Sequence, residues 1–131
     1  GSMRKIIDMT IDYCRERKVF GKPLIENQWI YFKLSELIAE LEAYKHLVYH
    51  CVDKYVQGQD VTREASIAKL KLGRLSRQIA DTCLQFHGGM GYVEEYPMAR
   101  YFRDSRLASI GGGADEVMLE IIARYEGISP K

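Results

Sequence analysis

The chain has 131 residues, the length of a single domain and enough to bury a hydrophobic core. Its 19 basic and 18 acidic side chains nearly cancel, which argues against nucleic acid as a partner and against a polybasic membrane patch. No apolar run is long enough to be a transmembrane segment, and no signal-peptide pattern opens the chain. The three cysteines, Cys14, Cys51 and Cys83, are far apart and odd in number, which favours a reducing compartment.

The start of the chain predicts a helix that begins without its own cap. Residues 1–3, Gly-Ser-Met, are interpreted as an expression-tag remnant, so the domain is expected to span residues 4–131. Residues 4–17 have helical periodicity, but no Ser, Thr, Asp or Asn precedes the first apolar position. Its inward side chains are expected to be Ile6, Met9 and Tyr13. We therefore expect the chain to be part of a longer protein.

Two long helices are predicted next, because apolar residues recur at intervals of three and four. The first covers about residues 25–57, and its stripe consists of Leu34, Leu37, Ile38, Leu41, Tyr44, Val48, Val52 and Tyr55. The second begins near Thr62, with Asp60 or Thr62 as its cap, and ends at Gly88-Gly89. Its stripe consists of Ala65, Ala68, Leu72, Leu75, Ile79, Cys83 and Phe86.

Two further helices complete the prediction. A short one follows Pro97, since proline suits a first helical position. The last covers residues 114–125, after the break at 111–113. Its inward residues are expected to be Val117, Ile121 and Tyr125, with Ile122 beside them. No stretch alternates like a half-buried strand. The fold class is therefore all-α, an antiparallel four-helix bundle.

The residues alone give few candidates for chemistry. Gly88-Gly89-Met90-Gly91 follows a helix rather than a strand, which excludes a Rossmann dinucleotide loop. On spacing, this turn and the glycines at 111–113 are best read as helix ends; close approach of a ligand to their backbone is the second interpretation. Glu42, His46 and His50 share a helix face, but no paired Glu-x-x-His motif accompanies them, so no metal site is expected.

Three sequence motifs give a more specific interpretation than spacing alone. The first is Arg-Lys-Val-Phe-Gly-Lys-Pro-Leu at 17–24, followed by Asn27-Gln28. The second is Gln-Phe-His-Gly-Gly-Met-Gly-Tyr at 85–92, followed by Glu-Tyr-Pro at 95–97. The third is Arg103-Asp104 with Ile-Gly-Gly-Gly-Ala-Asp-Glu at 110–116. In this order and spacing, over residues 4–126, the chain resembles the C-terminal helical domain of acyl-CoA dehydrogenases.

The resemblance implies a flavoenzyme whose subunit ends in this bundle. It implies FAD as cofactor, an acyl-CoA thioester as substrate, and oxidation of the α–β carbon–carbon bond. It also implies a dimer or tetramer in which the bundle touches FAD held mainly by the neighbouring subunit, with electron-transfer flavoprotein as a further partner. The location would be the mitochondrial matrix in a eukaryote and the cytoplasm in a bacterium. The fragment alone is expected to be inactive.

The resemblance also assigns residues to the cofactor. Arg17 would meet the FAD pyrophosphate, since a guanidinium pairs well with phosphate oxygens. Other side chains would support the adenosine half, the glycines would let backbone approach the ADP portion, and the start of the last helix would lie near the flavin. The full set is Arg17, Phe20, Leu24, Gln28, Gln85, Gly88, Gly89, Ala114 and Glu116.

One departure from the family pattern concerns the catalytic base. Many members carry a glutamate at the position of Gly112, and a threonine at that of Ala114. The present chain therefore has no catalytic residue of its own, and the base is expected upstream of Met3, as in the isovaleryl and long-chain branches. Two alternatives stay open: a degenerate member that has lost dehydrogenation, and a non-catalytic helical module for oligomerisation or interaction. A second enzyme interpretation is an acyl-CoA oxidase, because acyl-CoA oxidases share this bundle and use oxygen as the electron acceptor.

Overall fold

The computed structural model describes residues 1–130, so Lys131, the last residue of the expected domain, lies outside the described residues. The helices are α1 (Ser2–Glu16), α2 (Gln28–Val56), α3 (Thr62–His87), α4 (Gly89–Tyr92), α5 (Pro97–Ser105) and α6 (Asp115–Tyr125). Two short 3-10 helices are η1 (Leu24–Glu26) and η2 (Arg106–Ser109). A small antiparallel pair is formed by β1 (Lys18–Val19) and β2 (Lys22–Pro23). The predicted all-α class is confirmed.

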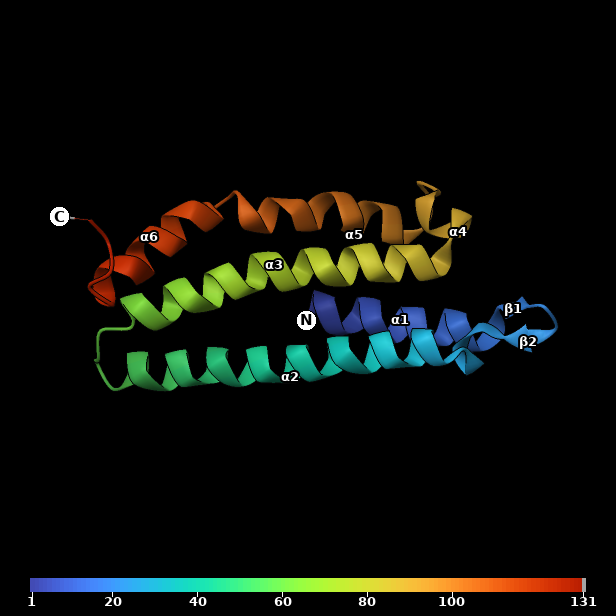
Figure 1. The fold of residues 1–131 in the computed structure, drawn as a ribbon, viewed down its shortest axis with the longest axis horizontal. Helices are drawn as coiled ribbons and strands as arrows, with labels where there is room; N and C mark the ends of the chain where they lie inside the picture. Colours follow the sequence, from blue (N-terminus) through green and yellow to red (C-terminus); the bar gives the residue numbers. More distant parts are fainter. Residues whose placement is uncertain (131) are drawn as a thin grey trace.

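The helices form an antiparallel bundle with α3 at its centre (Figure 1). α1 and α2 run along one side of α3, and the α5–α6 line runs along the other. α1 covers only about half of α2, and the β1–β2 hairpin projects beyond the bundle at the end where α4 lies. Within residues 1–130, no helix combines the length and the apolar character that a membrane span requires.

α3 can occupy the centre because both of its sides are suited to burial. Its large apolar residues join α1 and α2 in one core, which consists of Ile6, Ile7, Cys14, Ile30, Leu34, Leu37, Leu41, Leu75, Ile79, Cys83, Phe86 and Met98. Its opposite side carries small residues, among them Gly73 and Ser76. Ser76 Oγ lies 3.1 Å from the hydroxyl of Tyr101 on α5. A side chain at Gly73 would meet Ser109 Oγ at 2.5 Å, so only glycine allows η2 to come this close.

The predicted boundaries hold well where caps define them. α3 spans Thr62–His87, and its N-cap is Val61 rather than the predicted Asp60 or Thr62. The Asp60 carboxylate nevertheless accepts hydrogen bonds from the backbone N–H and the hydroxyl of Thr62. α2 begins at Gln28, three residues later than predicted, because Asn27 accepts a hydrogen bond from the Trp29 N–H and caps the helix there.

Several predicted inward positions are wrong. Val52 and Tyr55 are exposed, because α1 begins beside the middle of α2 and does not cover the C-terminal part of that helix. Val117 and Tyr125 are each half exposed, whereas Met118 is buried. An ideal Cβ at Gly113 would lie 2.7 Å from Met118 Cε, so α6 is turned to direct Met118, rather than Val117, into the bundle.

The sequence pattern did not predict the β1–β2 hairpin or the four-residue helix α4. The hairpin turns at Phe20 and Gly21, which both have positive φ, 51° and 81°. Two successive residues with positive φ form the tight turn that matches the twist of paired strands. Gly88 does end α3, as predicted, but Gly89 begins the four-residue helix α4 rather than continuing the break.

Candidate functional site

One open hollow gathers most of the residues of the first two motifs. It lies where the C-terminus of α3 meets the start of the hairpin and of α2, and its volume is about 640 Å³. Five of the nine predicted cofactor residues line it: Arg17, Leu24, Gln85, Gly88 and Gly89. The remaining lining residues are Tyr13, Val19, Trp29, Ile30, Phe86, His87 and Met90. Motifs separated by about sixty residues of sequence are thus brought to one surface.

Arg17 is held at the rim of this hollow by its backbone, which leaves its side chain available. It is the C-cap of α1, its N–H donates to the Tyr13 carbonyl, and its own carbonyl accepts from the Leu24 N–H at 2.7 Å. The guanidinium is exposed and forms none of the ion pairs found among residues 1–130. An unpaired guanidinium beside an open hollow is suited to bind a phosphate or carboxylate.

Gly88 and Gly89 form the opposite wall, for different reasons. Gly88 has φ 57° and ψ −140°, a backbone conformation that side-chain-bearing residues rarely adopt. Gly89 has no positive φ, and an ideal Cβ built on it would meet no atom within 4 Å. No feature of this chain's own packing therefore requires glycine at residue 89. A bare backbone facing open space can accept a ligand at close range.

Phe20 and Gln28 lie beside this hollow rather than in it. Phe20 is fully exposed at the hairpin tip and lines a neighbouring hollow of about 470 Å³, which shares Leu24 with the first. Gln28 is the first residue of α2 and is exposed. A fully exposed phenylalanine with positive φ is energetically unfavourable in the isolated chain.

Ala114 and Glu116 lie beside the middle of α3, because Asp115 between them contacts Gly73, Arg74 and Arg77 of that helix. Ala114 is the N-cap of α6, and Glu116 is exposed in the first turn of that helix. Lys69 of α3 approaches the same turn, where its ammonium donates hydrogen bonds to the carbonyls of Ala108 at 2.6 Å and Gly113 at 2.8 Å. Gly73 and Arg77, which contact Asp115, are twelve and eight residues from Gln85 on the same helix, which corresponds to about 18 and 12 Å. The nine predicted residues are therefore divided between the end of the bundle at the C-terminus of α3 and the start of α6, beside the middle of α3.

Ion pairs also hold the N-terminus of α6 against α3. Asp115, at the first position of α6, is buried, and its Oδ2 lies 3.6 Å from Arg77 Nη2 and 3.7 Å from Arg74 Nε. A carboxylate at a helix N-terminus is stabilised by the free N–H groups there. Gly112 lies just outside this network, with φ 66° and only Lys69 Cε, at 4.0 Å, near an ideal Cβ. No carboxylate occupies residue 112.

Seven residues of the first hollow were not predicted as site residues, and two of them, Tyr13 and His87, contact each other. Tyr13 was expected only in the core. The rings of Tyr13 and His87 stack with centroids 4.4 Å apart, and the Tyr13 hydroxyl donates to the His87 carbonyl at 3.2 Å. Burial lowers the pKa of His87 below its usual value. A signal for this pair is absent from the sequence, because the two residues are 74 positions apart.

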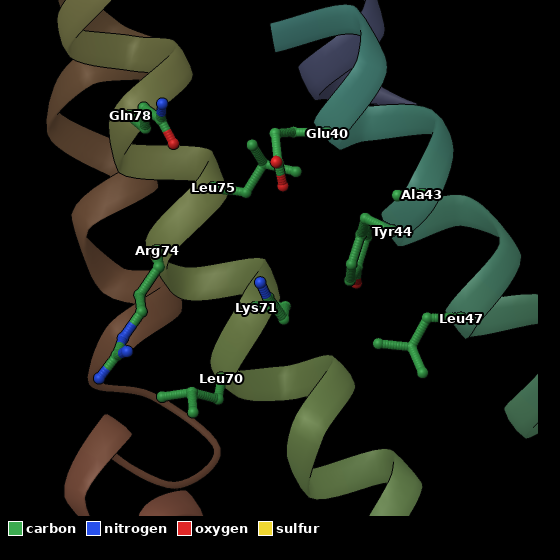
Figure 2. A pocket seen from close by; sticks show the side chains of 9 residues that line it. All are labelled: Glu40, Ala43, Tyr44, Leu47, Leu70, Lys71, Arg74, Leu75 and Gln78. Atoms are coloured by element: carbon green, nitrogen blue, oxygen red, sulfur yellow. The ribbon is translucent and has the colours of Figure 1, made fainter. Parts of the chain in front are cut away.

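Another hollow, of about 220 Å³, lies between α2 and α3 (Figure 2). Its walls carry Glu40 and Tyr44 from α2 and Lys71 and Arg74 from α3. None of the predicted cofactor residues lines it. Glu42, His46 and His50 remain on the outer side of α2, and among residues 1–130 no group of three His, Cys, Asp or Glu side chains is arranged to hold a metal ion.

Known proteins match the chain in both sequence and fold. The chain is 35% identical over 125 residues to an acyl-CoA dehydrogenase of Bacillus subtilis, which covers 95% of this chain and 33% of that protein. Butyryl-CoA dehydrogenase from Megasphaera elsdenii superimposes with a TM-score of 0.92 at 34% identity, over 95% of this chain and 32% of that structure. The FAD complex of PigA superimposes with a TM-score of 0.93 at 25% identity, over 98% and 33%.

The chain thus spans about a third of the length of the relatives that it matches. The match to the family described as "Acyl-CoA dehydrogenase, C-terminal domain" covers residues 1–126, which is nearly the whole of the chain. This agrees with the three motifs, with the helical bundle and with the superimposed structures. The chain belongs to the acyl-CoA dehydrogenase family and corresponds to its C-terminal domain.

Proposed function

We propose that this chain is the C-terminal domain of an FAD-dependent acyl-CoA dehydrogenase, in which it completes the cofactor site and the oligomer interface. Residues 4–131 would form the domain, preceded by the tag remnant at 1–3. The observation that carries the proposal is the hollow lined by Arg17, Gln85 and Gly89, whose unpaired guanidinium and bare backbone suit a dinucleotide. An oligomerisation module would need none of these three features.

The residues of the first hollow would hold the ADP half of FAD. Arg17 would pair with the pyrophosphate, and Gln85, Gly88 and Gly89 would receive the adenosine side along bare backbone. Leu24, Phe20 and Gln28 would support the same half from the hairpin and the start of α2. Because the hollow is open and its lining residues enclose only part of a dinucleotide, the bound molecule would be held mainly by a neighbouring subunit, as the family resemblance implies.

The start of α6 would meet a flavin. Ala114 and Glu116 lie beside residues 73–77 of α3, about 12–18 Å along that helix from Gln85. When bound, FAD accepts the hydride that leaves the β-carbon of the acyl-CoA. The free N–H groups at the start of α6 would face the electron-rich edge of that ring.

Removal of the α-proton requires a base that this chain lacks. Gly112 carries no carboxylate, Asp115 is buried against Arg74 and Arg77, and Glu116 corresponds to a non-catalytic position of the family pattern. The base would therefore come from the part of the protein that precedes this domain. On this view the isolated domain is inactive, and acyl-chain length is selected by residues outside it.

The cofactor assignment is tested by FAD content in the full-length protein. Arg17→Ala should lower the FAD that remains after purification by at least about tenfold, the equivalent of one charged contact with phosphate. Arg17→Lys should retain part of it, because lysine keeps the charge but not the bidentate geometry. Arg15→Ala is the matched control, because Arg15 is an exposed arginine two residues away that pairs with Asp12. Unchanged flavin content in Arg17→Ala, with an intact oligomer, would contradict the proposal.

The reaction is tested by anaerobic titration of the full-length protein with saturated acyl-CoAs of graded length. Bleaching of the flavin by one length class would support dehydrogenation by a base outside this domain. Bound FAD that no acyl-CoA bleaches would instead favour a degenerate member, in which the missing carboxylate at Gly112 is the cause. Reoxidation of the reduced flavin by electron-transfer flavoprotein or by oxygen would then distinguish a dehydrogenase from an oxidase.

A further inference from the structure

The imidazole of His87 is enclosed at the junction of three elements. Its side chain is 2% exposed. It stacks on Tyr13 of α1 and lies 5.3 Å, centroid to centroid, from the tilted ring of Tyr96, which precedes α5. An ideal Cβ at Gly91 of α4 would lie 2.9 Å from the His87 Cβ, so α4 also packs directly against it. At the turn after α3, His87 therefore contacts α1, α4 and the segment that precedes α5.

The hydrogen bonds define the state of this ring. His87 Nδ1 lies 2.8 Å from the carbonyl oxygen of Cys83. A carbonyl oxygen only accepts, so Nδ1 carries the proton and donates it. Nε2 is buried and has no partner among residues 1–130, so in the neutral ring it is a bare acceptor. The ring is thus locked in one tautomer and one orientation.

Tyr13 ties the backbone of the turn to α1. Its hydroxyl donates to the carbonyl of His87, the last residue of α3, whose carbonyl has no partner within the helix. The next residue, Gly88, has φ 57°, and Gly89 follows with its Cα open to the hollow. The direction of the Gly88–Gly89 peptide therefore depends on where the His87 carbonyl is held.

We infer that Tyr13 and His87 are positioning residues, which together hold the Gly88–Gly89 turn in the shape that receives the nucleotide half of FAD. The inference rests on the proposed function, since it concerns the same hollow. Both side chains act through the turn: His87 is buried, and the Tyr13 hydroxyl is engaged by the His87 carbonyl. A turn held in place before binding avoids the entropy of ordering it afterwards.

The test compares two tyrosine variants in the full-length protein. Tyr13→Phe removes the hydroxyl at the turn and keeps the stacked ring. Tyr101→Phe removes the hydroxyl that meets Ser76 on the other side of α3, far from the hollow, and is the matched control. Tyr13→Phe should raise the dissociation constant of FAD by about tenfold, one hydrogen bond's worth, and Tyr101→Phe by less than about twofold. Equal effects of the two variants, at equal loss of thermal stability, would overturn the inference.

A second measurement does not depend on FAD. In the isotopically labelled 131-residue chain, the ¹⁵N shifts of His87 should report a protonated Nδ1 and a bare Nε2 at neutral pH. In Tyr13→Phe the amide signals of Gly88 and Gly89 should broaden or shift, whereas in Tyr101→Phe they should not. A protonated Nε2 with a bare Nδ1, or unperturbed glycine amides in Tyr13→Phe, would overturn the inference.

Arg17→Ala separates this inference from the proposed function. If Arg17→Ala loses FAD while Tyr13→Phe retains full affinity, the hollow binds the cofactor but the two positioning residues are wrong. If neither variant affects FAD, the cofactor assignment of the hollow itself fails. His87→Phe, which keeps an aromatic ring against Tyr13, replaces Tyr13→Phe should that variant not fold, and it should weaken FAD binding by a similar factor.

Discussion

The ammonium of Lys69 donates a hydrogen bond to the carbonyl oxygen of Gly113 at 2.8 Å and a second one to the carbonyl of Ala108 at 2.6 Å. No carboxylate among residues 1–130 pairs with this partly buried cation. Lys69 instead closes the loop between η2 and α6 onto α3 and satisfies two carbonyls that have no helical partner. The glycine turn at the start of α6 is therefore held by a single side chain from a different helix.

Replacing Lys69 by methionine should destabilise the chain, because it keeps the apolar stem but leaves both carbonyls without a donor. The expected loss is about 2–4 kcal/mol in the free energy of unfolding, measured with urea, since each bond involves a charged donor. Lys71→Met is the control, because Lys71 is exposed half a turn away and makes none of the hydrogen bonds found among residues 1–130. Equal urea midpoints for the two variants would refute a structural role for Lys69.

The sequence predicted the parts of the fold in which local pattern and burial agree. α3 was predicted with its bounds and with five of its ten buried residues, Ala68, Leu75, Ile79, Cys83 and Phe86, whereas Ala65, predicted to point inward, is exposed. α6 was predicted as a helix, but of its expected inward residues Val117 and Tyr125 are half exposed, whereas Ile121 and Ile122 are partly buried. Val117, Met118 and Ile121 are all apolar, so periodicity permits more than one rotation, and the contact of Met118 with Gly113 selects one of them.

The candidate site, too, could be predicted only in part from the sequence. Arg17, Gln85 and Gly89 belong to recognisable motifs, and the structure brings them to one hollow. Tyr13 and Lys69 could not be assigned from the sequence, because their partners are 74 and 44 residues away along the chain. A tyrosine on an apolar stripe and a lysine flanked by Ala68 and Leu70 carry no local sign of such contacts. Only the pairing of helices reveals them.

Gly73→Ala should destabilise the chain even though alanine favours a helix by about 1 kcal/mol over glycine. The new methyl group would lie 2.5 Å from Ser109 Oγ, 3.0 Å from the Ala108 carbonyl oxygen and 3.0 Å from Asp115 Oδ1. The carbonyl cannot move without shifting η2, so we expect a net loss of about 1–3 kcal/mol in urea unfolding.

Gly89→Ala provides the contrast, because a Cβ there meets no atom within 4 Å. Its stability should stay within about 0.5 kcal/mol of the unmodified chain, as for other open surface sites. In the full-length protein the same substitution should weaken FAD binding. A large loss of stability in Gly89→Ala, or none in Gly73→Ala, would show that the packing around α3 differs from this description.

The cysteines should differ sharply in reactivity. Burial raises the pKa of both Cys14 and Cys83 to about 11, and both side chains are fully buried. At pH 8 their thiolate fraction would be about one in a thousand even if reagent could reach them. Ellman's reagent should therefore titrate one thiol, Cys51, in the native chain and all three in urea. Cys51→Ser should abolish the native reaction; a native reaction that survives this substitution would contradict the burial of the other two.

Acid should weaken the fold through His87. Burial lowers the pKa of this imidazole below its ordinary value of 6.5, so on acidification the unfolded chain takes up the proton before the folded chain does. The stabilisation is therefore complete above pH 6.5 and is lost as the pH falls from there through the folded pKa, by at most about 1.4 kcal/mol per pH unit for one group. The titratable side chains packed on the ring are those of Tyr13 and Tyr96, and Arg17 is a charged neighbour in the same hollow.

The measurement is urea unfolding at pH 7.5 and at pH 5.5. The free energy of unfolding should fall between these values in the unmodified chain and much less in His87→Phe, which cannot take up a proton. The lowered pKa values of Asp60 and Glu64 act in the same direction but below pH 4.5, outside this window. His46 and His50 are exposed, and replacing both by glutamine should leave the pH dependence in place. If the double variant removed it and His87→Phe did not, the acid sensitivity would belong to the surface of α2.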